Sequence, residues 1–208
     1  MSEEQAGRDA KLLYEIGSLR HVARTWRQFG GVPYANVAEH TLRVCWIAML
    51  ISESEGADSA RAVKIAMIHD VPEIRTGDVN YLTRMYVDRR EGEALADIFE
   101  GSSVQDEAAA LWQEYEDRQS IEAKVVKDAD TIDCDLELME SSALGFSLKA
   151  PLLETRDRAY QRLYTKTGRR LFEAIYSSDP HAWHIEGKNR MTQGDWSNEL
   201  KLPAGDHD

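Results

Sequence analysis

The sequence predicts an all-α fold built around one hydrophobic core, and three observations support this. The 208 residues include only five prolines, so long segments run without a helix breaker. Apolar residues recur at intervals of three and four along these segments, which is the helical period. The sequence has neither extended apolar–polar alternation nor Asn-Gly or Asp-Gly hairpin turns between apolar runs, so strand signals are nearly absent.

The helical periodicity predicts the elements in order along the chain. The predicted helices are Arg8–Ala23, Val37–Glu55, Asp58–His69, Val87–Glu100, Val104–Asp117, Ser120–Leu144 and Pro151–Tyr176. Connections are expected at Arg24–Asn36 and Thr76–Tyr86. From Ser177 the composition turns polar with scattered tryptophans. We therefore expect a single helical domain over residues 1–176 and a loop-like C-terminal extension over residues 177–208.

The composition is that of a soluble globular protein, with 42% apolar and 30% charged residues. No stretch approaches the roughly 18 uncharged apolar residues of a membrane span, and the acidic N-terminus does not resemble a secretory signal. Cys45 and Cys134 lack a partner motif, so we expect free thiols in a reducing cytoplasm. The net charge of −12 argues against nucleic acid as a partner. A small phosphate substrate would need a local cation, either side chains or a bound metal.

Two predicted helices each carry a histidine on the apolar face. His40 shares a face with Val37 and Val44, and His69 shares a face with Ile65 at the end of its helix. Both imidazoles are therefore expected to point toward the core. When His40 is considered alone, a buried neutral histidine with one satisfied nitrogen is the favoured explanation.

The stretch AMIHDVPEIRTGD places one histidine and three acids directly after an apolar run. Asp70 is a candidate N-cap for a short turn that carries Pro72 near its start, and Glu73 is a candidate capping-box acid. Asp78 has the simple alternative of a turn acid beside glycine. The other interpretation is a reaction centre, because Glu73 follows His69 by four residues and would adjoin it on a continuous helix.

The segment KVVKDADTIDCDLELME contributes a further acid. Asp130 falls at the border of the buried stripe of its helix, whereas Asp128 and Asp135 fall on more exposed positions. A carboxylate that is buried or half-buried inside a helix is unfavourable unless it is paired or bound to a cation. Lys127 is expected to be an exposed helix lysine, with contact to a phosphate as the alternative.

Three separate helices are thus predicted to direct ligand-type side chains inward: His40, then His69 with Asp70, then Asp130. Two imidazoles and two carboxylates suit one divalent transition ion such as Mn, Co, Fe, Ni or Zn. Four protein ligands leave positions for water and substrate if the geometry is octahedral. The combination predicts a metal site more strongly than any of its members does alone.

The order His40, His69-Asp70 and Asp130 resembles the signature of the HD-domain metal-dependent phosphohydrolases. More narrowly, the sequence looks like the 5′-deoxynucleotidases, which are nucleoside 5′-monophosphate phosphatases. The segments that carry the resemblance are LRHVARTW, ANVAEHTLRV, AMIHDVPEIRTGD, LWQEYE and EAKVVKDAD. The resemblance as a whole covers about Leu12 to Met139. The resemblance implies a helical HD-domain bundle with the metal in its core.

The resemblance also implies roles for individual residues. The two histidines and two aspartates named above would hold one divalent ion. Glu73 and Asp78 would flank the attacking water and the leaving group as base, acid or orienting groups. Arg24, His69 and Asp78 would contact the substrate, a nucleoside 5′-monophosphate that is hydrolysed to nucleoside and phosphate. The resemblance also implies a homodimer.

Several alternatives stay open at this level. Arg24 has the alternative of a solvated loop cation, and Trp26 stands one place later than the tryptophan of close relatives. A nucleoside triphosphatase would use the same metal site, with Arg84, Arg89 and Arg90 as further cations for the longer anion. A third hypothesis is a metal-stabilised helical scaffold or regulatory binder without catalytic turnover. The amphipathic C-terminal helix would either complete the core or pair with a second chain.

Overall fold

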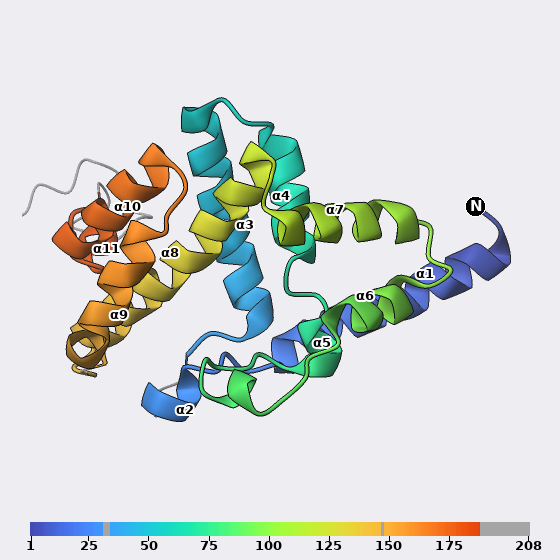
Figure 1. Ribbon diagram of the computed structural model, residues 1–208, viewed down its shortest axis with the longest axis horizontal. Helices are drawn as coiled ribbons and strands as arrows, with labels where there is room; N and C mark the ends of the chain where they lie inside the picture. The colour runs from blue at the N-terminus through green and yellow to red at the C-terminus, as the bar shows by residue number, and fades with distance from the viewer. Residues whose placement is uncertain (31–33, 147, 188–208) are drawn as a thin grey trace, which may run out of the picture. The chain divides into compact units, whose positions relative to one another are not determined.

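The computed structural model describes residues 1–30, 34–146 and 148–187, and these consist of helices joined by loops (Figure 1). The elements are α1 (Glu3–Ile16), η1 (Gly17–His21), α2 (Arg27–Gly30), α3 (Val37–Glu55), α4 (Ser59–Ile68), α5 (Glu73–Thr76), η2 (Thr83–Met85), α6 (Glu91–Phe99), α7 (Gln105–Asp117), α8 (Ile121–Ala143), α9 (Lys149–Gln161), α10 (Lys166–Ser177) and α11 (Ala182–Ile185). Within the described ranges the only β geometry is an isolated antiparallel bridge between Ala23 and Asn36. The predicted all-α class is confirmed.

The chain divides into two compact units, residues 1–176 and residues 177–208. The first unit contains the helices from α1 through nearly all of α10. In the second unit the described part is 177–187, which includes the short helix α11. Residues 188–208 of the expected extension lie outside the described residues, so the predicted domain division stays a prediction. None of the described helices is long and apolar enough to cross a membrane.

Several helix boundaries differ from the sequence prediction for local reasons. The first helix begins earlier, because the Ser2 side chain accepts a hydrogen bond from the amide of Gln5 and caps α1. The predicted helix Pro151–Tyr176 is in fact two helices, α9 and α10. The break coincides with a cap from a distant helix, because Asp128 accepts hydrogen bonds from the amides of Tyr164 and Thr165. Sequence periodicity carries no signal for a cap of this kind.

A capping box fixes the start of α3. The Asn36 side chain accepts a hydrogen bond from the amide of Glu39, whose carboxylate accepts one from the amide of Asn36. The helix ends at Gly56, whose φ of 69° belongs to the left-handed region that glycine adopts readily. His40 therefore occupies the first turn of a helix with well-defined ends.

Two hydrophobic clusters form the core of the first unit. The first cluster joins α3, α4, α7, α8 and α10, and the second joins α1, η1, the start of α3, α6 and α7. Helix α3 packs against both α4 and α8 near the middle of the first cluster (Figure 1). His40 lies on α3 between Val37 of the second cluster and Val44 of the first, and Ile68 packs against both clusters. The candidate site is therefore held where two packed cores meet.

Two acids of α8 that were expected on exposed positions are buried instead. Asp128 is 1% exposed and Asp135 is 0% exposed. The prediction was wrong because α9, α10 and the connection between them contribute polar partners to this face of α8. Asp135 binds the guanidinium of Arg156 and accepts a hydrogen bond of 2.8 Å from the Tyr176 hydroxyl. Each buried carboxylate is thus satisfied by a neighbouring element, as burial of charge requires.

Candidate metal centre

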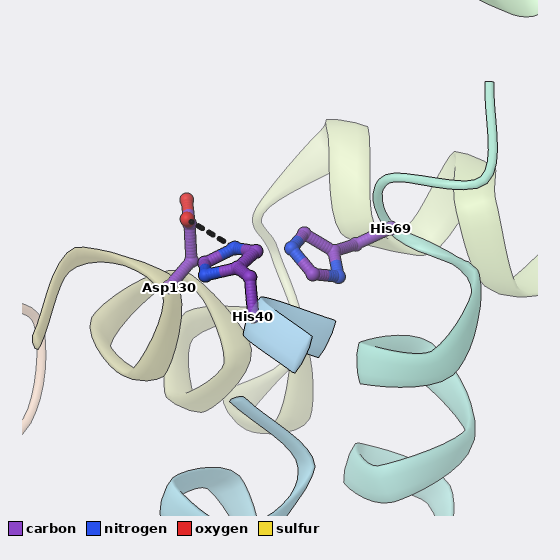
Figure 2. Close-up of side chains that lie close together, drawn as sticks. All are labelled: His40, His69 and Asp130. Carbon is purple, nitrogen blue, oxygen red and sulfur yellow. Dashed lines mark ion pairs between the residues drawn. The ribbon is translucent and has the colours of Figure 1, made fainter. Parts of the chain in front are cut away.

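Three helices bring imidazole and carboxylate groups to one point in the first unit. His40 comes from α3, His69 ends α4 and Asp130 comes from α8, and their ligand atoms all lie within 4.8 Å of one another. Figure 2 shows the three side chains gathered from their separate elements, with a dashed line between His40 and Asp130. That line joins His40 Nε2 to Asp130 Oδ1 over 3.4 Å. The grouping is of the kind that holds a divalent metal ion.

Asp70 turns its carboxylate toward both histidines. Its Oδ2 atom lies 3.3 Å from His40 Nε2 and 3.1 Å from His69 Nε2. The short helix α5 has Pro72 at its N-cap position and receives no side-chain capping hydrogen bond. The capping interpretation of Asp70 was therefore wrong, and this acid belongs to the histidine cluster.

The hydrogen bonds of the two imidazoles leave one nitrogen of each ring available to a metal. His40 Nδ1 lies 2.5 Å from an oxygen of Asp133, and His69 Nδ1 lies 2.7 Å from the carbonyl oxygen of Ala66. Because both partners are acceptors, Nδ1 carries the hydrogen, and Nε2 is the nitrogen whose lone pair a metal ion would take. Both Nε2 atoms are buried without a hydrogen-bond partner and face carboxylate oxygens. Lone pairs that face anionic oxygens fit a cation held between them.

The charges around the centre also favour a cation. Burial opposes protonation of His40, as does Arg24, yet the surrounding carboxylates outweigh both and raise its pKa well above the ordinary value. Burial opposes ionisation of Asp70, but the two histidines hold its pKa well below the usual range. For Asp130 burial again acts against ionisation, and Lys127 is the largest influence that lowers the pKa. Both carboxylates are therefore anionic at neutral pH, as metal ligands must be.

Asp130 is held so that one of its oxygens faces the centre. Its Oδ2 accepts hydrogen bonds from Lys127 Nζ at 2.7 Å and from the Tyr115 hydroxyl at 3.3 Å. The Tyr115 ring in turn packs edge-on against His69, with 5.3 Å between the ring centroids. Lys127 was expected to be an exposed lysine; its side chain is 39% exposed, and its ammonium is bound to this carboxylate.

Arg24 and Asp78 lie together next to the histidine cluster. Arg24 Nη1 is 3.3 Å from Asp78 Oδ2 and 3.9 Å from Asp70 Oδ2. The amide of Thr25 also donates to Asp78 Oδ2, at 2.9 Å. Gly77, with φ of 74°, makes the turn that directs Asp78 inward. Arg24 is only 6% exposed, so it is not a solvated loop cation, and Asp78 is more than a turn acid.

Glu73 is the first residue of α5 and is buried near the same cluster. Its Oε2 atom has no hydrogen-bond partner, and its Oε1 atom lies 3.6 Å from the guanidinium of Arg89. Burial is the main reason that its pKa is raised to about 10, and the negative charges of Asp70 and Asp78 act in the same direction. Glu73 is thus a proton-binding group of perturbed pKa beside a candidate metal centre, which is a common feature of active sites.

The structure brings all the residues predicted from sequence into one region of the first unit. They are Arg24, His40, His69, Asp70, Glu73, Asp78 and Asp130. Sequence reasoning missed Asp133 and Tyr115. Asp133 follows Asp130 by three residues, and this spacing places both side chains on one face of a helix. The spacing could therefore have indicated that Asp133 lies near the site. Tyr115 had no such signal, because only the packing of α7 brings it to the cluster.

The fold and the site define a class of protein: a helical domain that gathers two histidines and two aspartates around a position suited to one metal ion. The profile of the HD domain family matches residues 16–167 of the chain. The chain belongs to the HD domain family. The resemblance seen in the histidine and aspartate motifs is confirmed by this match.

The similar proteins carry names that agree with the narrower resemblance. The 5′-deoxynucleotidase HDDC2 of Bos taurus is 32% identical over 145 residues, which cover 65% of this chain and 70% of that protein. The protein of the same name from Homo sapiens is 31% identical over 131 residues, which cover 60% of this chain and 64% of that protein. A predicted metal-dependent phosphohydrolase from Magnetospirillum magnetotacticum shares the fold, with a TM-score of 0.70, 24% identity and coverage of 84% of this chain and 92% of that one.

Proposed function

We propose that this chain is a metal-dependent phosphomonoesterase that hydrolyses deoxynucleoside 5′-monophosphates to nucleoside and phosphate. The observation that carries the proposal is the pair of buried, unpartnered Nε2 atoms of His40 and His69, which converge with Asp70 and Asp130. The similar bovine and human proteins are named 5′-deoxynucleotidases, which supports this substrate class.

His40, His69, Asp70 and Asp130 would hold one divalent transition ion. Two imidazoles and two carboxylates are compatible with Mn, Co, Fe, Ni or Zn, and the donor set does not choose among them. When bound, such an ion neutralises charge on the phosphoryl group and lowers the pKa of a coordinated water. This chemistry is needed because phosphomonoesters are among the slowest substrates to hydrolyse without a catalyst.

Glu73 and Asp78 differ in a way that assigns their proposed roles. The Oδ2 atom of Asp78 is already engaged by Arg24 and by the amide of Thr25, so Asp78 orients the arginine. Glu73 has an oxygen without a partner and a raised pKa, so it is the group that exchanges a proton with the water or the leaving oxygen. Arg24 offers the planar donors that suit contact with a phosphate. Both Arg24 and His69 contact Asp70 Oδ2, so His69 would also lie near the substrate.

The arginines of the loop before α6 favour a monophosphate over a triphosphate. Arg90 pairs with Glu93 at the surface, and Arg84 Nε donates to the carbonyl of Val79. Of these three loop arginines, Arg89 alone has an ion pair with a residue of the proposed centre, Glu73, at 3.6 Å. A triphosphate would need several cations directed at the site, and of these three loop arginines one, Arg89, contacts the proposed centre.

The test is phosphate release from a panel of deoxynucleoside and ribonucleoside 5′-monophosphates. Protein treated with a chelator should be inactive and should regain activity with Mn²⁺ or Co²⁺. Failure of the metal-loaded protein to release phosphate from any monophosphate would overturn the proposal. Product analysis with deoxynucleoside triphosphates distinguishes a triphosphatase from a monophosphatase. A non-enzymatic scaffold would be indicated if the native protein has no activity and the Glu73→Ala variant keeps its metal content.

A homodimer in the cytoplasm completes the proposal. Phe172 and Ile175 of α10 are buried in the first hydrophobic cluster, so this helix completes the core. Leu42, Trp46 and Leu50, spaced by four residues on α3, are exposed and offer an apolar face to a second copy. Light scattering should give twice the chain mass for the native protein, and Trp46→Glu should shift it toward the monomer.

A further inference from the structure

Asp133 contacts the side of His40 that faces away from the proposed metal position. Its Oδ2 atom lies 2.5 Å from His40 Nδ1, and the side chain is fully buried. Its other oxygen, Oδ1, is bound by the guanidinium of Arg43. Asp133 is therefore a carboxylate that accepts the Nδ1 hydrogen.

Arg43 holds Asp133 in place from the other side. Arg43 Nε donates to Asp133 Oδ1, and Arg43 Nη1 donates to both carboxylate oxygens of Glu140, at 2.7 and 2.9 Å. The Arg43 side chain is 29% exposed and that of Glu140 is 52% exposed. A chain of charged groups thus runs from the surface of α8 to the buried imidazole.

The arrangement follows from the same spacing on two packed helices. Arg43 follows His40 by three residues on α3, and Asp133 follows Asp130 by three residues on α8, so each pair shares one helix face. Asp130 faces Nε2 of the imidazole and Asp133 faces Nδ1. We propose that Asp133, oriented by Arg43, positions His40 and sets how tightly the centre binds its metal; this inference rests on the proposed function.

The proposal has a physical basis in how a hydrogen bond to one imidazole nitrogen acts on the other. A carboxylate at Nδ1 fixes the ring orientation and the tautomer, and it increases the basicity of Nε2. His69 has only a backbone carbonyl at the corresponding position, so a side-chain substitution can remove this support from His40 alone. Asp133 contacts Nδ1 and not the Nε2 proposed to hold the metal, so it is a positioning residue.

The experiment compares Asp133→Asn with a matched control on the same helix. We expect Asp133→Asn to weaken Co²⁺ binding by about 10- to 100-fold, measured in competition with a chromophoric chelator. The control is Asp128→Asn, another buried carboxylate of α8, whose partners are Tyr164 and Thr165 of the connection before α10. This variant should lower stability yet keep Co²⁺ affinity within about twofold of the native protein.

A direct-ligand variant separates the inference from the proposal on which it rests. If His40→Ala loses Co²⁺ affinity while folded Asp133→Asn stays within about twofold of the native protein, the positioning role is overturned. If His40→Ala also binds Co²⁺ normally, the proposed metal site fails and the inference fails with it.

A second measurement uses the native protein and does not depend on the variant folding. Nitrogen NMR of histidine-labelled, Zn²⁺-loaded protein should show His40 protonated at Nδ1. A hydrogen on Nε2 would overturn the proposal.

Discussion

Arg24 and Asp78 form a buried ion pair, with 3.3 Å between Nη1 of the guanidinium and Oδ2 of the carboxylate. The pair joins the connection after η1 to the turn after α5, two segments that are distant in the sequence. It also places Arg24 within 3.9 Å of Asp70 Oδ2. The proposed phosphate-binding arginine is therefore tied directly to the proposed metal centre.

Replacing Arg24 by glutamine should lower both stability and activity. The substitution leaves Asp78 buried without its cation, and breaking a buried pair in this way costs about 3–5 kcal/mol. Loss of a donor to the phosphoryl group should reduce kcat/KM for a deoxynucleoside monophosphate by about 100-fold. Urea unfolding and steady-state kinetics measure the two effects.

Arg75 provides the control for this substitution. Its side chain is 40% exposed, and its guanidinium pairs with Glu15 at 2.8 Å, so Arg75→Gln should cost no more than about 1 kcal/mol. Equal unfolding midpoints for the native protein and Arg24→Gln would show that the Arg24 pair contributes nothing to the fold.

Glu73→Gln should remove catalysis and leave the metal centre intact. Glutamine keeps the shape of the side chain but cannot exchange a proton, so kcat should fall by about 10²- to 10⁴-fold. Metal content, measured by elemental analysis, should be unchanged. Glu91→Gln is the control, because Glu91 pairs with the same arginine, Arg89, at 2.7 Å but does not belong to the proposed centre. A Glu73→Gln enzyme with native kcat would exclude Glu73 as the proton-exchanging group.

The same substitution predicts a pH-dependent difference in the stability of chelator-treated protein. The pKa of Glu73 is raised to about 10, mainly by burial. A raised pKa in the folded state means that its stabilising contribution is complete at low pH and is lost as the pH rises toward the folded-state pKa. Glutamine mimics the protonated form at every pH. Glu73→Gln should therefore gain stability relative to the native protein between about pH 5 and about pH 9, as followed by thermal unfolding; a constant difference would contradict the raised pKa.

Gly168→Ala should destabilise the junction between α8 and α10. A Cβ atom at Gly168 would lie 2.7 Å from Asp128 Oδ2 and 2.8 Å from Thr165 Oγ1, so the capping hydrogen bonds would have to shift. The expected loss is about 1–3 kcal/mol by urea unfolding, with kcat unchanged. Gly92→Ala is the control, because its Cβ would meet Trp112 at an ordinary 3.5 Å; equal losses in the two variants would disprove the steric cause.

Much of the candidate site was predictable because helical periodicity reports which face of a helix is buried. His40 and His69 were expected on apolar faces, and both are buried. Periodicity failed for Asp128 and Asp135, since it treats charged residues as exposed and cannot know that other helices will supply their partners. It also failed for the break between α9 and α10, which depends on a cap from α8.

The sequence by itself determined the all-α class, the inward direction of the two histidines and the membership of the HD domain family. These properties follow from local spacing and from short motifs, which each segment carries without reference to its neighbours. Only the tertiary structure decided that Asp70 faces His40 and His69, that Arg24 pairs with Asp78, and that Asp133 supports His40. The physical reason is that each of these contacts joins side chains from different elements, or depends on how a turn directs a side chain, and helical periodicity encodes neither.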